Sequence, residues 1–136
     1  MTSVAVLFDL DGTLALSEPL HHRALSDVLD DLGLRPPIVF DVAMTGQAIQ
    51  VVHQALVHQI GLPLDLPAFA SAKYRAYLGR MSELQWRPGA REAVEAARAS
   101  GCGVAVVTNS DRMLLDASLR QLGWVWPDQV SVSRND

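Results

Sequence analysis

Short apolar runs alternate along this chain with longer segments in which apolar residues recur every three or four positions. The run from Val4 to Phe8 is short, rich in valine and free of polar residues, which predicts a fully buried β-strand. The run from Val104 to Val107 predicts a second buried strand, and Val130 to Ser133 the start of a third. Three short strands are therefore expected.

The segments between these runs have the spacing of amphipathic helices. In the first, Leu25, Val28, Leu29 and Leu32 fall on one face. The same periodicity predicts five helices, over residues 18–32, 46–60, 66–81, 90–99 and 111–122. Glycines at positions 33, 61 and 101 are suitable helix ends, because glycine readily adopts the left-handed conformation found there.

The order of these elements predicts an α/β fold. A strand is followed by a helical insert of about 70 residues, and then helix, strand, helix and strand alternate. Strands joined through helices favour right-handed crossovers and a parallel sheet. In such sheets ligands bind at the carboxyl ends of the strands.

Composition and charge narrow the possible functions. The chain has 136 residues, of which 49% are hydrophobic, so it can bury a core. Its net charge is −4 and its basic residues are scattered, which argues against nucleic acid or a membrane surface as partner. We find no signal peptide and no apolar run near the roughly 18 residues of a membrane span. The single cysteine, Cys102, favours a cytoplasmic location.

Two carboxylates follow the first strand directly, at Asp9 and Asp11. Residues two apart in an extended chain point to the same side, so both acids can face one pocket. Their mutual repulsion disfavours this arrangement unless a cation offsets it, and oxygen ligands in a partial site favour Mg²⁺. The simpler alternative is a pair of ordinary turn acids.

The neighbouring residues suit an anion. Gly12 allows a sharp turn whose exposed amides could bind phosphate. Thr108 and Ser110 follow the second strand and offer hydroxyl groups beside a helix N-terminus. Both could instead serve the start of that helix, and we interpret Ser110 as a capping residue rather than a ligand.

Three motifs resemble those of one family. The segments FDLDGTL, PGA and VAVVTNS resemble the haloacid dehalogenase-like superfamily, in its phosphatase and phosphomutase branch. The resemblance implies a Rossmann-like core in residues 1–15 and 85–136, ending after about the third strand, and a small α-helical cap in residues 16–84. It also indicates an N-terminal fragment or truncated product, because relatives continue into further strands.

The resemblance also implies roles for individual residues. Asp9 would be the nucleophile that forms an aspartyl-phosphate, and Asp11 the general acid and base. The Asp9 carboxylate and the Asp11 backbone carbonyl would bind Mg²⁺. Thr108, with the backbone amides near Leu10 and Asn109, would hold the phosphoryl oxygens.

Within the insert, SEPLHHRAL resembles the sugar-phosphate phosphatase and β-phosphoglucomutase subgroup. This implies substrate-side roles for Ser17, His21 and Lys73, although His21 could be a solvated helix residue and Lys73 a plain surface lysine. Ile49 departs from the mutase, which has an arginine there. His53 and His58 are interpreted as surface or packing residues, and the three tryptophans as core or partner-facing aromatics (Trp86, Trp124 and Trp126).

The function expected is therefore a Mg²⁺-dependent phosphatase acting on a small phosphorylated metabolite, such as a sugar phosphate or phosphoglycolate. A β-phosphoglucomutase-like phosphotransferase is one alternative. A non-catalytic fragment or paralogue is the other, because the only lysine, Lys73, lies in the insert and the core lysine of the family is missing. An incomplete sheet would also favour self-association.

Overall fold

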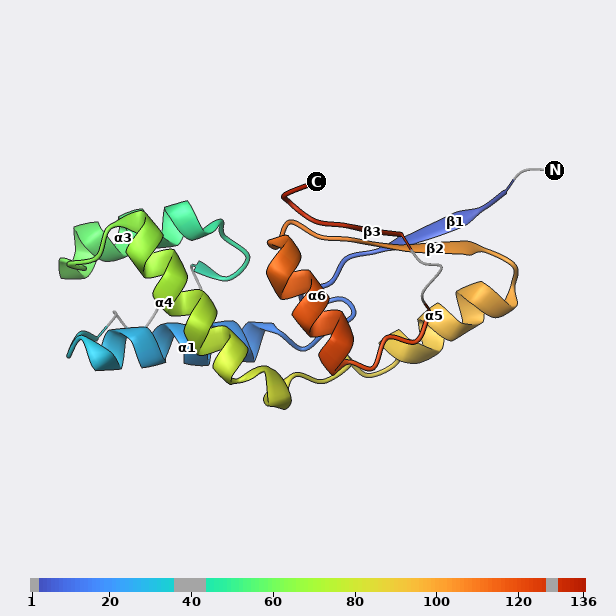
Figure 1. Cartoon of the computed structure of the whole chain (residues 1–136), viewed down its shortest axis with the longest axis horizontal. Helices are drawn as coiled ribbons and strands as arrows, with labels where there is room; N and C mark the ends of the chain where they lie inside the picture. Colours follow the sequence, from blue (N-terminus) through green and yellow to red (C-terminus); the bar gives the residue numbers. More distant parts are fainter. Residues whose placement is uncertain (1–2, 36–43, 127–129) are drawn as a thin grey trace. The chain divides into compact units, whose positions relative to one another are not determined.

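The computed structural model describes residues 3–35, 44–126 and 130–136 (Figure 1). The predicted α/β order is confirmed, with boundaries that differ from the expected ones by a few residues. The elements are β1 (Ala5–Phe8), α1 (Glu18–Asp31), α3 (Ile49–Ile60), α4 (Leu66–Gly79), the 3₁₀ turn η1 (Met81–Glu83), α5 (Ala90–Ala99), β2 (Gly103–Val107), α6 (Arg112–Gln121) and β3 (Val130–Val132).

The chain divides into two compact units. The first, here called the sheet unit, comprises Met1–Ser17 and Met81–Asp136. The second, the helical unit, comprises Glu18–Arg80. Among the described residues, no helix combines the length and the apolar character needed to cross a membrane.

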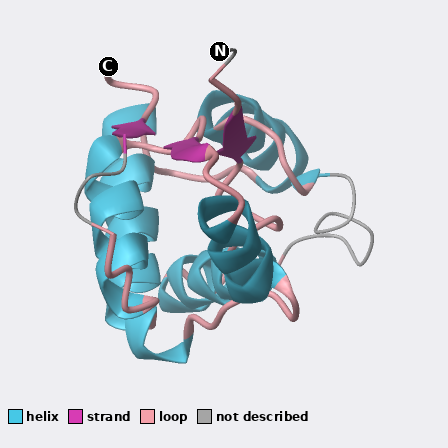
Figure 2. Ribbon diagram, turned by 90° about the vertical axis from the view of Figure 1, so that its right-hand side faces the viewer, coloured by secondary structure: helices cyan, strands magenta, loops and turns pink. Residues whose placement is uncertain are grey.

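The strands of the sheet unit form one parallel sheet in the order β1-β2-β3. Val6 is in register with Val104, and Ala105 with Val130. Helix α5 precedes β2 and helix α6 connects β2 to β3, as expected for crossover connections (Figure 2). Since the three strands run in the same direction, the residues that follow each of them meet at one edge.

The two faces of the sheet differ, and the prediction of a fully buried first strand is wrong. Helices α5 and α6 lie on the same side of the sheet, where Val104 and Val106 are buried (Figure 1). On the other face Leu7 is 67% exposed and Val130 is 62% exposed. Both crossovers step across the sheet in the same direction, so right-handedness puts both helices on one side.

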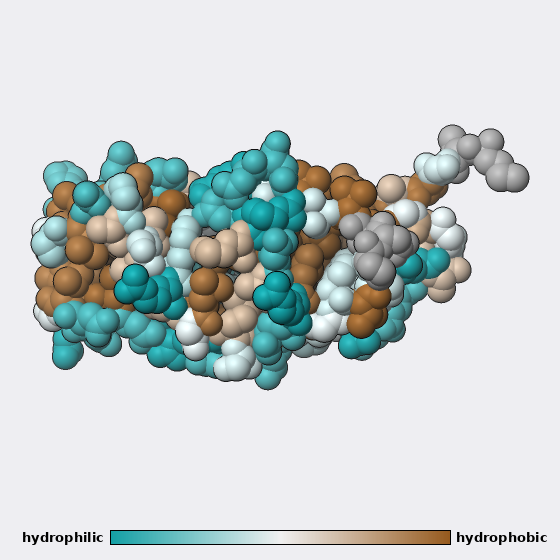
Figure 3. All heavy atoms as spheres, in the orientation of Figure 1, coloured by the Kyte–Doolittle hydropathy of each residue, from teal (hydrophilic) through white to brown (hydrophobic). Residues whose placement is uncertain are grey.

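Apolar side chains consequently gather over the strands at the surface (Figure 3). Their exposed members on the strands include Leu7, Val107, Val130 and Val132. An apolar sheet face of this kind favours association with another surface. The self-association expected from the sequence remains a prediction.

The helical unit has its own hydrophobic core. Its buried cluster contains Leu25, Val28, Leu29, Ile49, Val52, Leu56, Leu62 and Phe69. Helix α4 begins at the N-cap Asp65, whose Oδ1 accepts a hydrogen bond of 2.9 Å from the amide of Ala68. Helix α3 ends at Gly61, whose φ of 66° is in the left-handed region. Local capping chemistry thus explains where these helices begin and end.

Candidate active site

The acids Asp9 and Asp11 lie in a tight turn that follows β1. The carbonyl oxygen of Leu10 accepts hydrogen bonds from the amides of Thr13, Leu14 and Ala15, at 3.3, 3.0 and 3.0 Å. Three bonds to one carbonyl require the chain to reverse within a few residues. Gly12 makes this possible with a φ of 73°, which a residue with a Cβ adopts only at a cost.

The carboxylate of Asp9 is exposed at this edge of the sheet. Its Oδ1 accepts a hydrogen bond of 2.7 Å from the amide of Leu10. The amide that the family resemblance assigns to a phosphoryl oxygen is therefore bound to Asp9 in this structure. A phosphoryl group would have to replace that hydrogen bond.

The segment after β2 contacts the second acid. Ser110 Oγ donates a hydrogen bond of 2.5 Å to Asp11 Oδ2, which joins positions 99 residues apart in the chain. The Ser110 amide donates to Thr108 Oγ1 at 3.1 Å, and Thr108 is almost fully buried. The structure thus brings Asp11, Thr108 and Ser110 together, and Asn109 lies exposed between the last two.

The interpretation of Ser110 as a helix cap is wrong. The N-cap of α6 is Asp111, in an extended conformation with φ −64° and ψ 147°. Ser110 lies one position earlier, and its hydroxyl donates to the Asp11 carboxylate. Sequence alone favoured capping because serine often precedes a helix, whereas the contact with Asp11 requires the parallel pairing of β1 and β2.

The segment after β3 completes this edge. The amide of Thr108 donates to the carbonyl of Val132 at 2.9 Å, and the amide of Arg134 donates to the carbonyl of Ser110 at 3.0 Å. The Arg134 guanidinium also donates to Asp111 Oδ1 at 2.5 Å. The ends of all three strands are therefore linked by hydrogen bonds around Ser110.

A carboxylate in the same segment is strongly stabilised in its charged form. Asp136 Oδ2 accepts hydrogen bonds from the amide and the hydroxyl of Ser133, both at 2.7 Å, and from the Arg112 guanidinium. The Ser133 amide, then its hydroxyl, then Arg112 lower the pKa of Asp136 to about 2. At neutral pH Asp136 is therefore charged and holds the turn that follows β3 through these hydrogen bonds.

Arg87, which was not predicted as a site residue from the sequence, also contacts the acidic turn. Its Nη1 donates to the carbonyl oxygen of Gly12, and its amide donates to the carbonyl of Leu14 at 2.8 Å. Arg87 is located next to the Pro88-Gly89 punctuation. Its position directly before the PGA motif is the sequence feature that could have indicated a place near the site.

The remaining predicted residues lie at the unit boundary or in the helical unit. Ser17 is fully buried, and within the described part of the chain its hydroxyl has no hydrogen-bond partner. His21 stacks on Tyr77, with ring centroids 4.2 Å apart, so it is not simply a solvated residue. Lys73 lies half-buried on α4. Roles for these residues at a substrate stay predictions.

The other aromatic and histidine residues have packing or surface positions, in line with their interpretation from the sequence. The Trp124 ring lies 6.0 Å from that of Trp86 and 4.8 Å from that of Trp126, measured between ring centroids. His53 Nε2 donates to the carbonyl of Leu64 at 2.8 Å, and His58 is exposed.

The donor set at this edge fits a hard cation in part. Asp9 and Asp11 supply carboxylate and carbonyl oxygens, which Mg²⁺ prefers, and Mg²⁺ commonly takes only one or two carboxylates beside water and phosphate. Among the described residues, however, no group of three or more His, Cys, Asp or Glu side chains could hold a metal ion. The acids could serve as part of a Mg²⁺ site that water and substrate complete.

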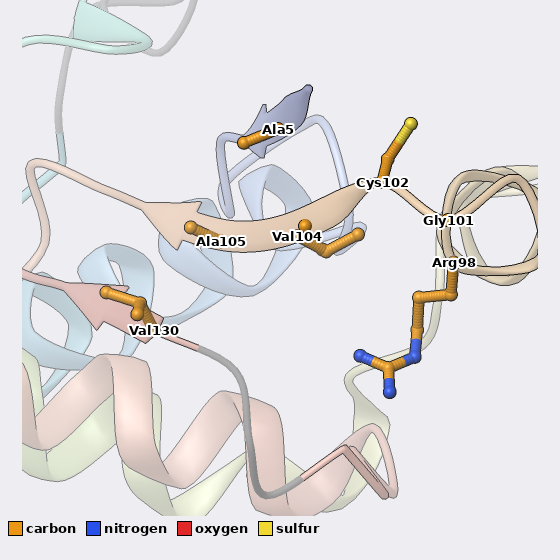
Figure 4. A pocket seen from close by; sticks show the side chains of 8 residues that line it. Ala5, Arg98, Gly101, Cys102, Val104, Ala105 and Val130 are labelled. Atoms are coloured by element: carbon orange, nitrogen blue, oxygen red, sulfur yellow. The ribbon is translucent and has the colours of Figure 1, made fainter. Parts of the chain in front are cut away.

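A cavity of about 460 Å³ lies elsewhere in the sheet unit (Figure 4). Its lining includes the first residues of the three strands, Ala5, Gly103 and Val130, and also Arg98 and Cys102. It is therefore at the amino ends of the strands, the opposite edge from Asp9 and Asp11. The two acids and the hydroxyl groups at the carboxyl ends of the strands, rather than this cavity, define the candidate active site.

Comparison with known proteins shows which proteins this chain resembles. Phosphoglycolate phosphatase from Xanthomonas campestris is 31% identical over 127 residues, covering 88% of this chain and 55% of that protein. Protein CbbY from Cereibacter sphaeroides is 32% identical over 125 residues, covering 85% and 54%. The chain spans about half the length of these two relatives.

A solved structure and a family model also match this chain. The crystal structure of CbbY from Rhodobacter sphaeroides in complex with phosphate matches 97% of this chain and 64% of that one, with a TM-score of 0.76 and 26% identity. The model of the haloacid dehalogenase-like hydrolases matches residues 4–134, which include both acids and the residues after β2. The chain therefore belongs to the haloacid dehalogenase-like hydrolase family.

Proposed function

We propose that the whole protein is a Mg²⁺-dependent phosphatase that hydrolyses a small phosphorylated metabolite of the sugar-phosphate or phosphoglycolate type. One observation carries the proposal: the acids that follow β1 lie beside the hydroxyl groups that follow β2, linked by the hydrogen bond from Ser110 to Asp11. Carboxylates can act as nucleophile and as proton carrier, while hydroxyl groups and amides bind phosphoryl oxygens. The phosphoglycolate phosphatase relative supports the choice of substrate class.

In the first step, a carboxylate oxygen of Asp9 attacks phosphorus. The bond between phosphorus and the substrate oxygen breaks, and Asp11 gives a proton to that leaving oxygen. The product is an alcohol and an aspartyl-phosphate on Asp9. Thr108 and the amides of Leu10 and Asn109 hold the phosphoryl oxygens in this proposal.

In the second step, water attacks the phosphorus of the aspartyl-phosphate. Asp11, now a carboxylate, takes a proton from the water, and the bond between phosphorus and Asp9 breaks. Inorganic phosphate leaves and both aspartates return to their starting states. Mg²⁺, when bound by the Asp9 carboxylate and the Asp11 carbonyl, supplies positive charge that offsets the negative charges gathered there.

The packing of Ile49 favours a phosphatase over the mutase alternative. Ile49 is the first residue of α3, is only 9% exposed and belongs to the core cluster of the helical unit. A buried isoleucine cannot bind the second phosphate of a bisphosphate, which a mutase must retain. Conversion of glucose 1-phosphate to glucose 6-phosphate without release of phosphate would support the mutase instead.

The test is Asp9→Asn in the whole protein, with phosphate release measured on a panel of sugar phosphates and phosphoglycolate. We expect phosphate release to be abolished while the circular dichroism spectrum and unfolding midpoint stay unchanged, because the asparagine amide is isosteric but cannot form the covalent intermediate. Asp30→Asn, on the exposed surface of α1, is the matched control. Retained turnover in the Asp9 variant would rule out the assigned nucleophile.

A binding assay separates this proposal from the non-catalytic alternative. The observation that favours a chain that binds without turnover is the lack of a core lysine in this sequence, whose only lysine, Lys73, lies in the insert. Fluoroberyllate is a phosphate mimic, so Mg²⁺-dependent binding of it without hydrolysis of any substrate would support that alternative.

We also propose that the protein is located in the cytoplasm, because a chain with a single cysteine cannot form an internal disulfide.

A further inference from the structure

Ser110 occupies the point at which the ends of the three strands meet. Its hydroxyl donates to Asp11, which follows β1, at 2.5 Å. Its amide donates to the Thr108 hydroxyl, at the end of β2, at 3.1 Å. Its carbonyl accepts from the amide of Arg134, after β3, at 3.0 Å. Three of its polar groups are therefore engaged, each by a different strand end.

These backbone contacts restrain the backbone of Ser110. Hydrogen bonds at both its amide and its carbonyl limit the movement of the backbone on either side of Ser110. Thr108 is buried directly after β2, and Arg134 lies two residues after β3, which pairs with β2. The Cβ of Ser110 is thereby held near Asp11, and its hydroxyl donates to Asp11 Oδ2.

Helix capping does not compete for this hydroxyl group. The extended N-cap of α6 is Asp111, whose Oδ1 accepts from Arg134 and from the Asn135 side chain, at 2.5 and 3.2 Å. The segment after β3 thus also holds the residue that follows Ser110. The short distance to Asp11 is typical of a hydroxyl that donates to a carboxylate.

We propose that Ser110 is a positioning residue that holds the Asp11 side chain in one rotamer, so that its carboxyl group is aligned for proton transfer. This inference rests on the proposed function, in which Asp11 carries the proton. Proton transfer requires the carboxyl oxygen to lie within hydrogen-bond reach of the substrate oxygen, and a freely rotating side chain meets this condition only part of the time. Ser110 therefore acts through Asp11 and not on the substrate.

The expected size of the effect follows from the strength of the hydrogen bond from Ser110 to Asp11 in its carboxylate state, in which Asp11 takes a proton from water. A hydrogen bond to a charged group contributes roughly 1.5–3 kcal/mol, and the loss of this energy from the transition state lowers the rate by about 10- to 100-fold. Ser110→Ala should therefore lower kcat by about 10- to 100-fold and change KM by less than about threefold. Ser110→Thr, which retains the hydroxyl, should recover most of kcat.

The experiment uses two measurements on the same variants. On the 136-residue chain, three-bond NMR couplings between the Asp11 backbone and its side-chain Cγ and Hβ report the χ1 rotamer. On the whole protein, kcat and KM are measured with the best substrate of the panel. Ser100→Ala is the matched control, because it also removes one serine hydroxyl. In the wild type this hydroxyl donates to the Ala96 carbonyl at the end of α5.

We expect couplings typical of a single Asp11 rotamer in the wild type and in Ser110→Thr, and averaged couplings in Ser110→Ala. Unchanged couplings in Ser110→Ala would overturn it, as would a rise in KM at constant kcat, which would make Ser110 a substrate ligand. A wild-type protein that hydrolyses nothing would refute the proposed function. The couplings would still decide whether Ser110 orients Asp11, so the two failures are distinguishable.

Discussion

The guanidinium group of Arg87 donates a hydrogen bond to the carbonyl oxygen of Gly12, across 75 positions of the sequence. Gly12 follows Asp11 directly, so this contact attaches the acidic turn to the segment that precedes α5. The Arg87 amide adds a second attachment at the Leu14 carbonyl. The turn that carries both acids is therefore held from outside as well as by its own hydrogen bonds.

Arg87→Ala should loosen this turn without unfolding the chain. The lost hydrogen bond is exposed, so we expect the free energy of unfolding to fall by about 1 kcal/mol at most. Amide hydrogen exchange of Thr13 to Ala15 should become several-fold faster. Arg91→Ala is the control, because Arg91 pairs with Glu95 on the exposed surface of α5. Equal exchange rates in both variants would show that Arg87 does not support the turn.

Neighbouring valines of β2 should differ sharply in their contribution to stability. Val106 is fully buried against the helices, whereas Val107 points to the open face and is 40% exposed. Val106→Ala should lower the free energy of unfolding by about 2 kcal/mol, and Val107→Ala by less than about 1 kcal/mol. Urea unfolding of both variants measures the difference. Similar losses would mean that the second face is covered as well.

The ion pair of the helical unit should contribute modestly to its stability. Arg80 Nε donates to Asp27 Oδ2 at 2.7 Å and Arg80 Nη2 to Asp27 Oδ1 at 2.9 Å, which is a bidentate arrangement. Both side chains are partly exposed, at 30% and 40%, so solvent screening limits the pair to about 0.5–1 kcal/mol. A double-mutant cycle with Asp27→Asn and Arg80→Gln measures this coupling. A coupling near zero at neutral pH would refute the prediction.

Asp136 should make stability depend on pH in the acid range. Its pKa is lowered from the ordinary 3.8 to about 2, chiefly by the Ser133 amide and hydroxyl. Because the folded pKa is below the unfolded one, the contribution is fully present above about pH 4 and is lost as pH falls toward 2. Asp136→Asn should thus be less stable than the wild type at pH 7, with a gap that closes between pH 4 and 2. Thermal unfolding at several pH values provides the measurement. A gap that does not change with pH would contradict the assignment.

Removal of divalent cations should abolish phosphate release by the whole protein. Two carboxylates alone would repel a phosphate dianion, and a bound Mg²⁺ offsets that charge. We expect EDTA to reduce kcat by at least about 100-fold, in the range found when charge stabilisation of a transferring phosphoryl group is lost. Added Mg²⁺ should restore it. Full activity in EDTA would contradict the proposed Mg²⁺ requirement.

The sequence by itself determined the elements and the location of the acids. Valine-rich runs, helical periodicity and terminal glycines are local signals, and they located the strands and helices to within a few residues. The acids follow β1 and the hydroxyl groups follow β2, which could be read from the sequence because parallel strands bring their carboxyl ends to one edge. The roles of Asp9, Asp11 and Thr108 come from the resemblance and await experiment.

Only the tertiary structure decided which groups touch. Ser110 donates to Asp11 across 99 positions and Arg87 to Gly12 across 75, and no local pattern encodes contacts between segments so far apart. The exposure of one face of the sheet was also decided by the tertiary structure. The apolar run of β1 looks fully buried in sequence, yet Leu7 is exposed because both crossovers place their helices on the opposite side. Local sequence sets the apolar pattern, whereas the handedness and direction of the connections decide which face is covered.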